Sequence, residues 1–195
     1  MVTGTISIPS GTQLVYVSFS AEINVKTTES LIAVMSNLAN LGVRQVYLIL
    51  NTPGGFVANG LNLYNMLQGM PFELTTHNAG NVDSIGNVIF LAGTIRYATS
   101  NATFMFHGVG FDITSKQRLE EKGLRELMGT VNSDQRRIGS IIAQHTNLST
   151  REIAELFREA KTKDASWAIN KGIVHEIRDV QIPAGCPVIS LVFQR

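Results

Sequence analysis

The chain has 195 residues, of which 44% are hydrophobic and 16% charged, and its formal net charge is +1. This length fits a single domain over residues 1–195 with a full core, and the apolar content excludes intrinsic disorder. The 16 Lys and Arg residues are balanced by 15 Asp and Glu residues, which argues against a nucleic-acid partner held by phosphate contacts.

The predicted elements begin with a strand over residues 14–19, where β-branched and aromatic side chains predominate. Residues 28–41 then place their apolar side chains on one face of a helix. The short apolar run of residues 45–50 is typical of a strand that is buried on both faces. Turn residues 51–55 follow, and three apolar side chains at helical spacing then indicate a second helix: Leu61, Tyr64 and Leu67.

The same order of strand, loop and helix continues along the chain. Residues 72–76 predict a strand, residues 78–83 a turn, and residues 84–91 an apolar helical segment. Three repeats of this order predict βαβ units and a largely parallel sheet. A further strand is expected at residues 102–106, directly before His107.

The C-terminal part of the chain is predicted to be mostly helical. Residues 114–144 have the apolar spacing of a long helix, although glycines interrupt it. A capping box at residues 149–152 starts a helix that runs to about residue 160. A short helix is expected at residues 164–171, and from residue 173 onward the chain is rich in strand-forming residues.

The first candidate functional feature is the pair of glycines in Pro53-Gly54-Gly55, at the carboxyl end of a predicted buried strand. Glycines there let the backbone turn sharply and expose its N–H groups, as an oxyanion hole requires. An ordinary turn between a strand and a helix would use the same residues.

Two further candidates are a nucleophile and a base. Ser84 lies between a predicted turn and the start of a helix, where the backbone N–H of Ile85 could bind an oxyanion; a simple helix cap is the alternative. His107 ends a predicted strand, from which it can project above the sheet toward a neighbouring loop, as a general base must. A hydrogen-bonded structural histidine is the alternative at that position.

In this order, the three loops resemble the Clp protease proteolytic subunit family, the serine peptidases that form barrel-shaped chambers. The resemblance runs from about residue 14 to residue 177. Residues 48–55 look like the family's strand and SPGG-type loop, with Thr52 in place of the serine. Residues 104–107 resemble its histidine strand, and residues 145–149 fall where the family carries an HTG-type turn.

The resemblance implies a role for each candidate residue. Ser84 would be the nucleophile and His107 its general base. The N–H groups of Gly55 and Ile85 would form the oxyanion hole. A serine hydroxyl needs such a base to attack at pH 7, and the tetrahedral intermediate needs fixed donors.

The resemblance also implies the fold and the assembly. The expected fold is α/β, a Clp/crotonase-like spiral of βαβ units in which residues 114–144 form a long handle helix that packs one ring against another. The expected function is that of a serine-type endopeptidase subunit, which hydrolyses peptides or unfolded polypeptides inside a homo-oligomeric ring. An ATP-dependent unfoldase is a candidate partner of such a ring. The charged fraction of 16%, against roughly 25% for soluble domains, also favours an oligomer.

The sequence departs from the family near the candidate site. Ala160 falls where the family carries the aspartate of its triad, and Glu159 or Asp164 could replace that acid only if the loop shifts. Asp83 stands where small residues are usual, beside the developing oxyanion. Two alternatives therefore stay open: a catalytically impaired pseudoenzyme that acts as a structural or regulatory ring subunit, and a crotonase-like acyl-CoA enzyme in which the serine and the histidine have no joint role.

The remaining signals concern ligands and compartment. No metal or other cofactor is expected, because His77, His145 and His175 lack metal-ligand spacing. The single cysteine, Cys186, excludes an internal disulfide framework and suits a reducing compartment. No apolar run approaches the roughly 18 residues that cross a bilayer, and the first residues show no secretory pattern. We therefore expect a cytoplasmic protein without a membrane partner.

Overall fold

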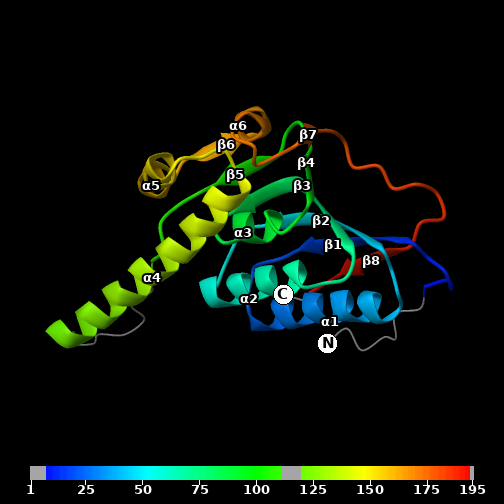
Figure 1. Cartoon of the computed structure of the whole chain (residues 1–195), viewed down its shortest axis with the longest axis horizontal. Helices are drawn as coiled ribbons and strands as arrows, with labels where there is room; N and C mark the ends of the chain where they lie inside the picture. The colour runs from blue at the N-terminus through cyan, green and yellow to red at the C-terminus, as the bar shows by residue number, and fades with distance from the viewer. Residues whose placement is uncertain (1–7, 111–119, 194–195) are drawn as a thin grey trace.

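The computed structural model describes residues 8–110 and 120–193 of the chain. Within these ranges eight strands form one sheet in the order β6-β5-β3-β2-β1-β8, and β4 pairs with β3 and β7 beside this path (Figure 1). The strands are β1 (Leu14–Ser20), β2 (Gln45–Thr52), β3 (Glu73–Asp83), β4 (Ile95–Ala98), β5 (Thr103–Met105), β6 (Thr162–Asp164), β7 (Glu176–Ile177) and β8 (Val188–Leu191). The described pairs are parallel except that of β5 with β6, so the prediction of a largely parallel sheet is confirmed.

Six helices accompany the sheet in the described ranges. They are α1 (Val25–Asn40), α2 (Val57–Gln68), α3 (Gly86–Phe90), α4 (Glu121–His145), α5 (Thr150–Glu159) and α6 (Ala165–Asn170). Figure 1 shows α1 and α2 side by side against the sheet, whereas α4 projects away from it. Residues 114–119 of the predicted long helix lie outside the described ranges. None of the six helices is both long enough and apolar enough to span a membrane.

The strand β2 lies at the centre of the core. Val46, Leu48 and Leu50 on one of its faces are buried, whereas Tyr47 and Ile49 on the other face are only half-buried. Successive side chains of a strand point to opposite faces of the sheet. The prediction that this strand is buried on both faces is therefore wrong for the isolated chain, where one face is covered completely and the other in part.

The strand β3 continues through residues 78–83, which predict a turn, so that prediction is wrong. The Asn78 side chain accepts a hydrogen bond from the N–H of Gly80 at 3.0 Å and donates one to the carbonyl of Thr103 in β5 at 2.8 Å. The turn-forming residues therefore produce an irregularity in the pairing with β2, where the register shifts, rather than a chain reversal. This irregular end of β3 leads directly to Ser84.

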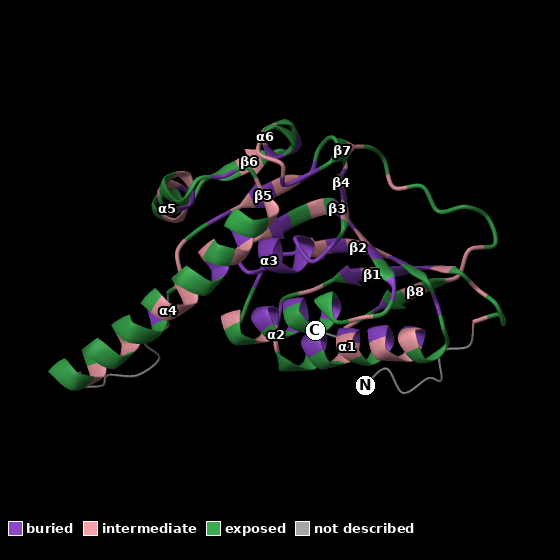
Figure 2. Ribbon diagram, viewed as in Figure 1, coloured by how far each residue is buried: buried purple, intermediate pink, exposed green. Residues whose placement is uncertain are grey.

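The helix α4 is buried only toward its C-terminal half. Val131, Ile138 and Ile142 are buried, whereas Leu124 and Met128 are 45% and 53% exposed. Figure 2 shows the same division, with the projecting end of α4 exposed. The apolar spacing of this helix thus continues beyond the core of the isolated chain.

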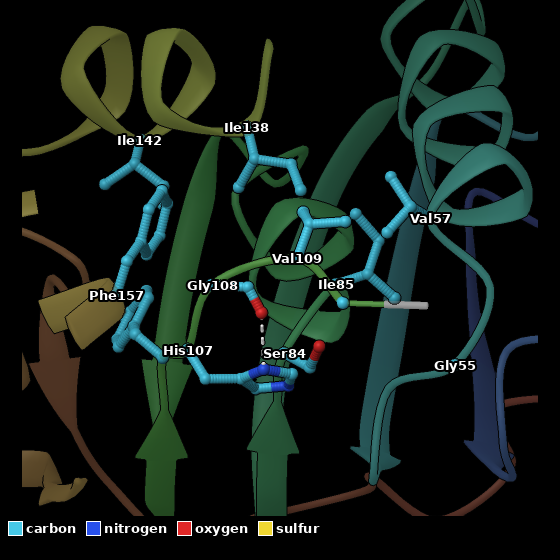
Figure 3. A pocket seen from close by; sticks show the side chains of 12 residues that line it. Gly55, Val57, Ser84, Ile85, His107, Gly108, Val109, Ile138, Ile142 and Phe157 are labelled. Atoms are coloured by element: carbon cyan, nitrogen blue, oxygen red, sulfur yellow. Dashed lines mark hydrogen bonds between the residues drawn. The ribbon is translucent and has the colours of Figure 1, made fainter. Parts of the chain in front are cut away.

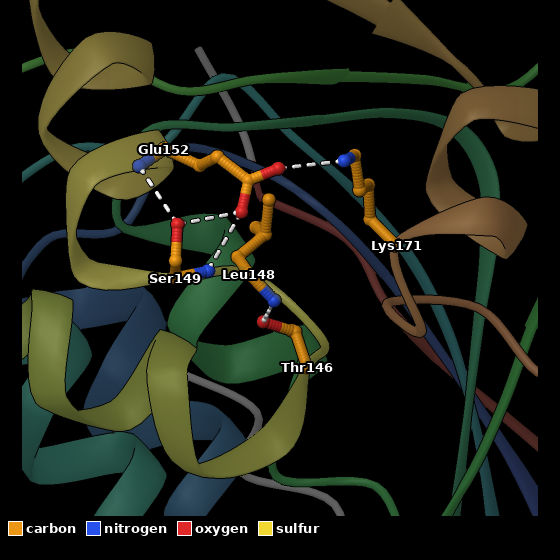
Figure 4. A network of polar contacts seen from close by, with 5 residues as sticks. All are labelled: Thr146, Leu148, Ser149, Glu152 and Lys171. Carbon is orange, nitrogen blue, oxygen red and sulfur yellow. Dashed lines mark hydrogen bonds and ion pairs between the residues drawn. The ribbon is translucent and has the colours of Figure 1, made fainter.

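The predicted capping box at the start of α5 is confirmed. The Ser149 hydroxyl accepts a hydrogen bond from the N–H of Glu152, whose carboxylate accepts one from the Ser149 N–H (Figure 4). Lys171, which follows α6, donates to the same carboxylate at 2.7 Å. The Lys171 bond, together with those of Ser149, lowers the pKa of Glu152 to about 2. This network ties the start of α5 to the end of α6, on either side of Ala160.

The sequence pattern does not predict β4 or β6, and it predicts too much strand in the tail. β4 and β6 are only four and three residues long, and β6 consists of polar residues that follow no apolar alternation. Residues 178–187, between β7 and β8, form no strand. Short pairings of this kind depend on the neighbouring strand rather than on the local sequence.

Candidate active site

The carboxyl ends of β2, β3 and β5, which are neighbours in the sheet, meet at a cavity of about 90 Å³. All four site residues predicted from the sequence line it: Gly55 after β2, Ser84 and Ile85 after β3, and His107 after β5 (Figure 3). Apolar side chains from α2, α4 and α5 close the rest of the cavity. The structure thus brings the candidate donors, nucleophile and base to one place.

The loop of Gly54 and Gly55 has a conformation that suits only glycine. The φ angles of the two residues are 88° and 145°, in the region that L side chains rarely adopt. A Cβ atom at Gly55 would also collide with the carbonyl oxygen of Ile23. Hydrogen bonds on both sides of Gly55 fix the loop: the Ile23 N–H donates to the Gly54 carbonyl at 2.7 Å, and the Phe56 N–H donates to the Ile23 carbonyl at 2.8 Å.

Ser84 occupies a strained turn between β3 and α3. Its φ angle is 56°, a left-handed conformation that costs a non-glycine residue about 1–3 kcal/mol. Its N–H donates to the carbonyl of Met105 at 2.8 Å, and its carbonyl accepts from the N–H of Asn87 at 3.1 Å. A strained turn of this kind exposes a serine at the edge of a sheet, as in the nucleophile elbows of hydrolases. The alternative that Ser84 caps the helix is wrong, since α3 begins after Ile85 and no side chain caps it.

Two backbone N–H groups are available at the cavity. Neither the N–H of Gly55 nor that of Ile85 donates a hydrogen bond to another described residue. An N–H group at such a site is satisfied by water or by a ligand oxygen. The two loops approach closely, because a Cβ atom at Gly54 would lie 2.7 Å from the Cβ of Ser84. The pair of N–H groups therefore has the composition of an oxyanion hole.

His107 is oriented by a backbone carbonyl. Its Nδ1 lies 2.7 Å from the carbonyl oxygen of Gly108 (Figure 3). Because a carbonyl only accepts hydrogen bonds, Nδ1 carries the proton and Nε2 is the basic nitrogen. The N–H of Gly108 donates in turn to the carbonyl of Phe157 at 3.0 Å, which connects the backbone between His107 and Gly108 to the last turn of α5. The sequence gives no signal for this contact, since its acceptor is a backbone atom.

The nucleophile and the base are neighbours without a direct bond. Figure 3 shows the side chains of Ser84 and His107 beside each other at the cavity, and no hydrogen bond joins them in the part of the chain that the structure describes. Catalytic hydrogen bonds are often long before substrate binds and tighten in the complex. His107 is exposed, so neighbouring side chains do not enclose it.

Three residues bear on the acid that the resemblance predicts for this site: Ala160, Glu159 and Asp164. Ala160 ends α5 in a left-handed conformation with a φ angle of 49°. Glu159 forms an ion pair with a lysine at 3.4 Å, and Asp164 accepts a backbone N–H at 2.7 Å at the start of α6. Within residues 8–110 and 120–193, no carboxylate hydrogen-bonds to the imidazole. The Gly108 carbonyl therefore fixes the histidine tautomer but supplies no negative charge.

Asp83, next to the nucleophile, is a partly buried carboxyl near the imidazole. It pairs with Met105 of β5, which by strand alternation places it on the same face of the sheet as His107. Its Oδ1 is buried without a hydrogen-bond partner among the described residues. Burial raises the pKa of Asp83, although the side chain of Asn81 and the nearby His107 oppose the shift. The ionised form of this carboxyl is therefore disfavoured in the folded protein.

The other histidines have structural contacts. His77 shares a 2.6 Å hydrogen bond with the Tyr47 hydroxyl, and burial lowers the pKa of His77 to about 4. His145 shares one of 2.8 Å with the hydroxyl of Tyr64, and His175 accepts a backbone N–H at 3.2 Å. Among the described residues, no three His, Cys, Asp or Glu side chains gather in a group that could hold a metal ion.

Comparisons with known proteins give a consistent result. A family model described as Clp protease matches residues 12–181. The curated "ATP-dependent Clp protease proteolytic subunit 1" of Leifsonia xyli subsp. xyli is 26% identical over 145 residues, which cover 70% of this chain and 68% of that protein. A solved structure of a ClpP1 mutant from Listeria monocytogenes matches with a TM-score of 0.73 at 21% identity, over 87% of this chain and 92% of that one. The likeness to this structure shows the same crotonase-like fold.

Proposed function

Since the chain belongs to the Clp protease family, we propose that it is a serine peptidase subunit that hydrolyses peptides or unfolded polypeptides inside a ring oligomer. The observation that carries the proposal is the meeting of Gly55, Ser84, Ile85 and His107 at one cavity. They come from three separate loops, and together they supply the groups that acyl transfer requires.

The proposed reaction proceeds through an acyl-enzyme. Nε2 of His107 takes the proton of the Ser84 hydroxyl as Oγ attacks the peptide carbonyl. The N–H groups of Gly55 and Ile85 donate to the oxyanion of the tetrahedral intermediate. The protonated imidazole gives its proton to the leaving amine, and the C–N bond breaks. Water, activated by the same nitrogen, then hydrolyses the ester on Ser84.

The Gly108 carbonyl takes over one of the two duties of a triad acid. Loss of the correct histidine tautomer costs a serine protease about 10⁴-fold in kcat. Here the 2.7 Å bond from Nδ1 to the carbonyl keeps that tautomer. A carbonyl stabilises the imidazolium less than a carboxylate does, because it carries no net charge. We therefore propose an active but slow hydrolase.

The cavity also favours a class of substrate. Its lining includes the apolar side chains of Val57, Ile138, Ile142 and Phe157. Its volume is about 90 Å³, well below the roughly 300–1,000 Å³ of pockets for drug-sized ligands. We expect a compact apolar side chain beside the scissile bond. The meeting of Ser84 and His107 at this cavity favours the peptidase over the acyl-CoA alternative.

The oligomer, its partner and its cellular compartment are parts of the same proposal. The exposed Leu124 and Met128 on α4 are suited to contacts between copies. An ATP-dependent unfoldase is a candidate partner, since the Leifsonia relative is named as ATP-dependent, and the proposed compartment is the cytoplasm. We treat residues 1–195 as one domain because the buried apolar side chains of the described sheet and helices form one contiguous cluster.

A fluorophosphonate probe tests the nucleophile directly. The wild-type protein is expected to form one covalent adduct at Ser84, detected by mass spectrometry, and to hydrolyse a fluorogenic peptide. The Ser84→Ala variant is expected to lose both signals and to keep its circular dichroism spectrum and its oligomeric state. A folded, oligomeric wild-type protein that stays unlabelled would overturn the assignment.

A pseudoenzyme that serves as a structural or regulatory ring subunit is the second candidate. Two observations favour it: the alanine at position 160 and the missing hydrogen bond between Ser84 and His107 in the described structure. It predicts no turnover by the isolated protein together with co-assembly with an active relative. Measurable peptide hydrolysis that vanishes in Ser84→Ala would exclude it.

A further inference from the structure

The side chain of Asn87, in the first turn of α3, bridges two backbone carbonyls beneath the candidate nucleophile. Its Nδ2 donates to the carbonyl of Ser84 at 3.0 Å and to the carbonyl of Met105 at 2.8 Å. The side chain is buried, with an exposed fraction of 1%. It therefore connects the turn after β3 with β5, the strand that ends two residues before His107.

The first of these bonds controls the orientation of a peptide group. The carbonyl of Ser84 and the N–H of Ile85 belong to the same planar peptide and point in opposite directions. The Asn87 amide shares this carbonyl with the backbone N–H of the same residue, at 3.1 Å. Together the two bonds fix the direction of the Ile85 N–H, which is one of the two proposed oxyanion donors. The φ angle of Ser84 is 56°, and such a conformation persists only where the surroundings determine it.

The second bond sets the distance between two strands at the site. The carbonyl of Met105 accepts both the N–H of Ser84 and the Nδ2 of Asn87. One carbonyl on β5 thus binds both the backbone N–H of Ser84 and the Asn87 amide, which also binds the Ser84 carbonyl. The Oδ1 of Asn87 is buried without a partner among the described residues, so the two donated bonds are what this amide contributes here.

We propose that Asn87 is a positioning residue of the peptidase site: it holds the peptide between Ser84 and Ile85 in the orientation that presents the oxyanion donor, and it fixes that peptide to the strand that carries His107. This inference rests on the proposed function. Asn87 does not touch the substrate, so its removal lowers the rate of the chemical step and leaves substrate binding almost unchanged.

The chain contains a matched control for Asn87. Asn78 is also a buried asparagine, and its Nδ2 also donates at 2.8 Å to a carbonyl of β5, that of Thr103. It makes no contact with Ser84 or Ile85 among its described hydrogen bonds. Asn78→Ala and Asn87→Ala thus each remove an amide that donates to a carbonyl of β5. Asn78 lies in β3 away from the site, and Asn87 lies in α3 beside the candidate nucleophile.

The experiment compares three variants with the wild-type protein in its native oligomeric state. The readouts are the rate constant of fluorophosphonate labelling at Ser84, kcat and KM for a peptide substrate, and the melting temperature. Removal of a whole oxyanion donor costs about 10²–10³-fold in kcat, so misorienting one is expected to lower kcat and labelling about 10- to 100-fold in Asn87→Ala, with KM changed less than two-fold. Asn78→Ala is expected to lose stability and to keep labelling within about two-fold of wild type. Asn87→Ser can still donate to the carbonyl three residues back but not to β5, and is expected to lie between them.

The outcomes separate the two proposals. If the wild-type protein labels and Asn87→Ala labels equally fast, the role of Asn87 is refuted and the proposed function stands. If Asn78→Ala slows labelling as much as Asn87→Ala, the effect is general loss of structure, and the role is again refuted. If the folded wild-type protein does not label, the proposed function fails and the role of Asn87 fails with it. Should Asn87→Ala not fold, Asn87→Ser decides in its place, because labelling at the wild-type rate would refute the role.

Discussion

Restoring a carboxylate at position 160 is the most informative change to this site. β5 and β6 are antiparallel, with Met105 opposite Thr162. Position 160 directly follows α5, and the N–H of Gly108, the residue after His107, donates at 3.0 Å to the carbonyl of Phe157 in the last turn of that helix. The Ala160→Asp variant therefore puts a carboxylate within reach of the imidazole, and we expect it to raise kcat/KM.

The size of the gain follows from the surroundings of the pair. A carboxylate about 4 Å from an imidazolium interacts by about 1 kcal/mol in water and about 4 kcal/mol near a protein surface. His107 and Ala160 are both exposed, so we expect about 1–2 kcal/mol, which is roughly 5- to 30-fold in kcat/KM. The larger gain of about 10⁴-fold that accompanies a corrected tautomer is not expected, since Gly108 already fixes the tautomer.

The same substitution changes stability little. Ala160 has a φ angle of 49°, a conformation that aspartate tolerates better than alanine. Against this, a negative charge at the C-terminal end of α5 is unfavourable by about 0.3–1 kcal/mol. The two effects oppose each other, so the melting temperature is expected to stay close to that of the wild-type protein.

The assay is the pH dependence of kcat/KM for a peptide substrate, with Ala160→Asn as the control. Asparagine has nearly the same shape and the same tolerance for the left-handed conformation, but it carries no charge. An equal gain in both variants would mean that backbone conformation, not charge, limits the wild-type protein. No gain, or a loss, in Ala160→Asp would refute the placement of position 160 beside the imidazole.

Three further predictions concern the surroundings of the site. Gly55→Ala is expected to lower kcat for peptide hydrolysis at least 100-fold, because the new Cβ would collide with the Ile23 carbonyl and displace the N–H donor. Retained turnover would exclude Gly55 as an oxyanion donor. Asp83→Asn is expected to raise the free energy of unfolding at pH 7, because burial raises the pKa of Asp83 in the folded state and the ionised form therefore opposes folding. That gain should shrink as pH falls through the folded-state pKa and vanish below the unfolded value of about 3.9, as urea titrations at several pH values would show. Arg96→Met is expected to lower the free energy of unfolding by about 3 kcal/mol or more, measured by urea denaturation, because the buried guanidinium donates to four carbonyls, those of Gly93, His145, Gly172 and Ile173.

The fold was predictable where apolar side chains recur with helical spacing and the core buries them, or where a capping motif marks the start of a helix. The helical spacing of Leu61, Tyr64 and Leu67 corresponds to α2, in which all three are buried, and the capping box corresponds to the start of α5. The prediction of a turn at residues 78–83 was wrong. The Asn78 side chain accepts a hydrogen bond from Gly80 and donates one to β5, so the segment stays within a strand. β6 could not be predicted, because three polar residues become a strand only by pairing with β5.

The sequence could predict the side chains of the candidate site but not their contacts with backbone atoms. Ser84 and His107 carry chemistry that spacing along the chain can indicate, and both line the same cavity. The Gly108 carbonyl has no side-chain signature, although it orients the imidazole. Asn87 reads as an ordinary polar residue in an apolar helix until the carbonyl of Met105 is seen 2.8 Å away. Contacts of this kind depend on which strands become neighbours, and the sequence does not state that.

The neighbouring strands also distinguish the candidate donors, nucleophile and base from position 160. Gly55, Ser84 and His107 follow β2, β3 and β5, three adjacent strands whose carboxyl ends meet at one edge by the geometry of a parallel sheet. Position 160 instead precedes β6, the antiparallel partner of β5. Its reach to the imidazole depends on a three-residue pairing at the edge of the sheet and on the end of α5. We therefore expect a substitution at this position to alter the charge near His107 while the candidate donors and the candidate nucleophile keep their places, so that it changes the rate of hydrolysis more than the stability of the fold.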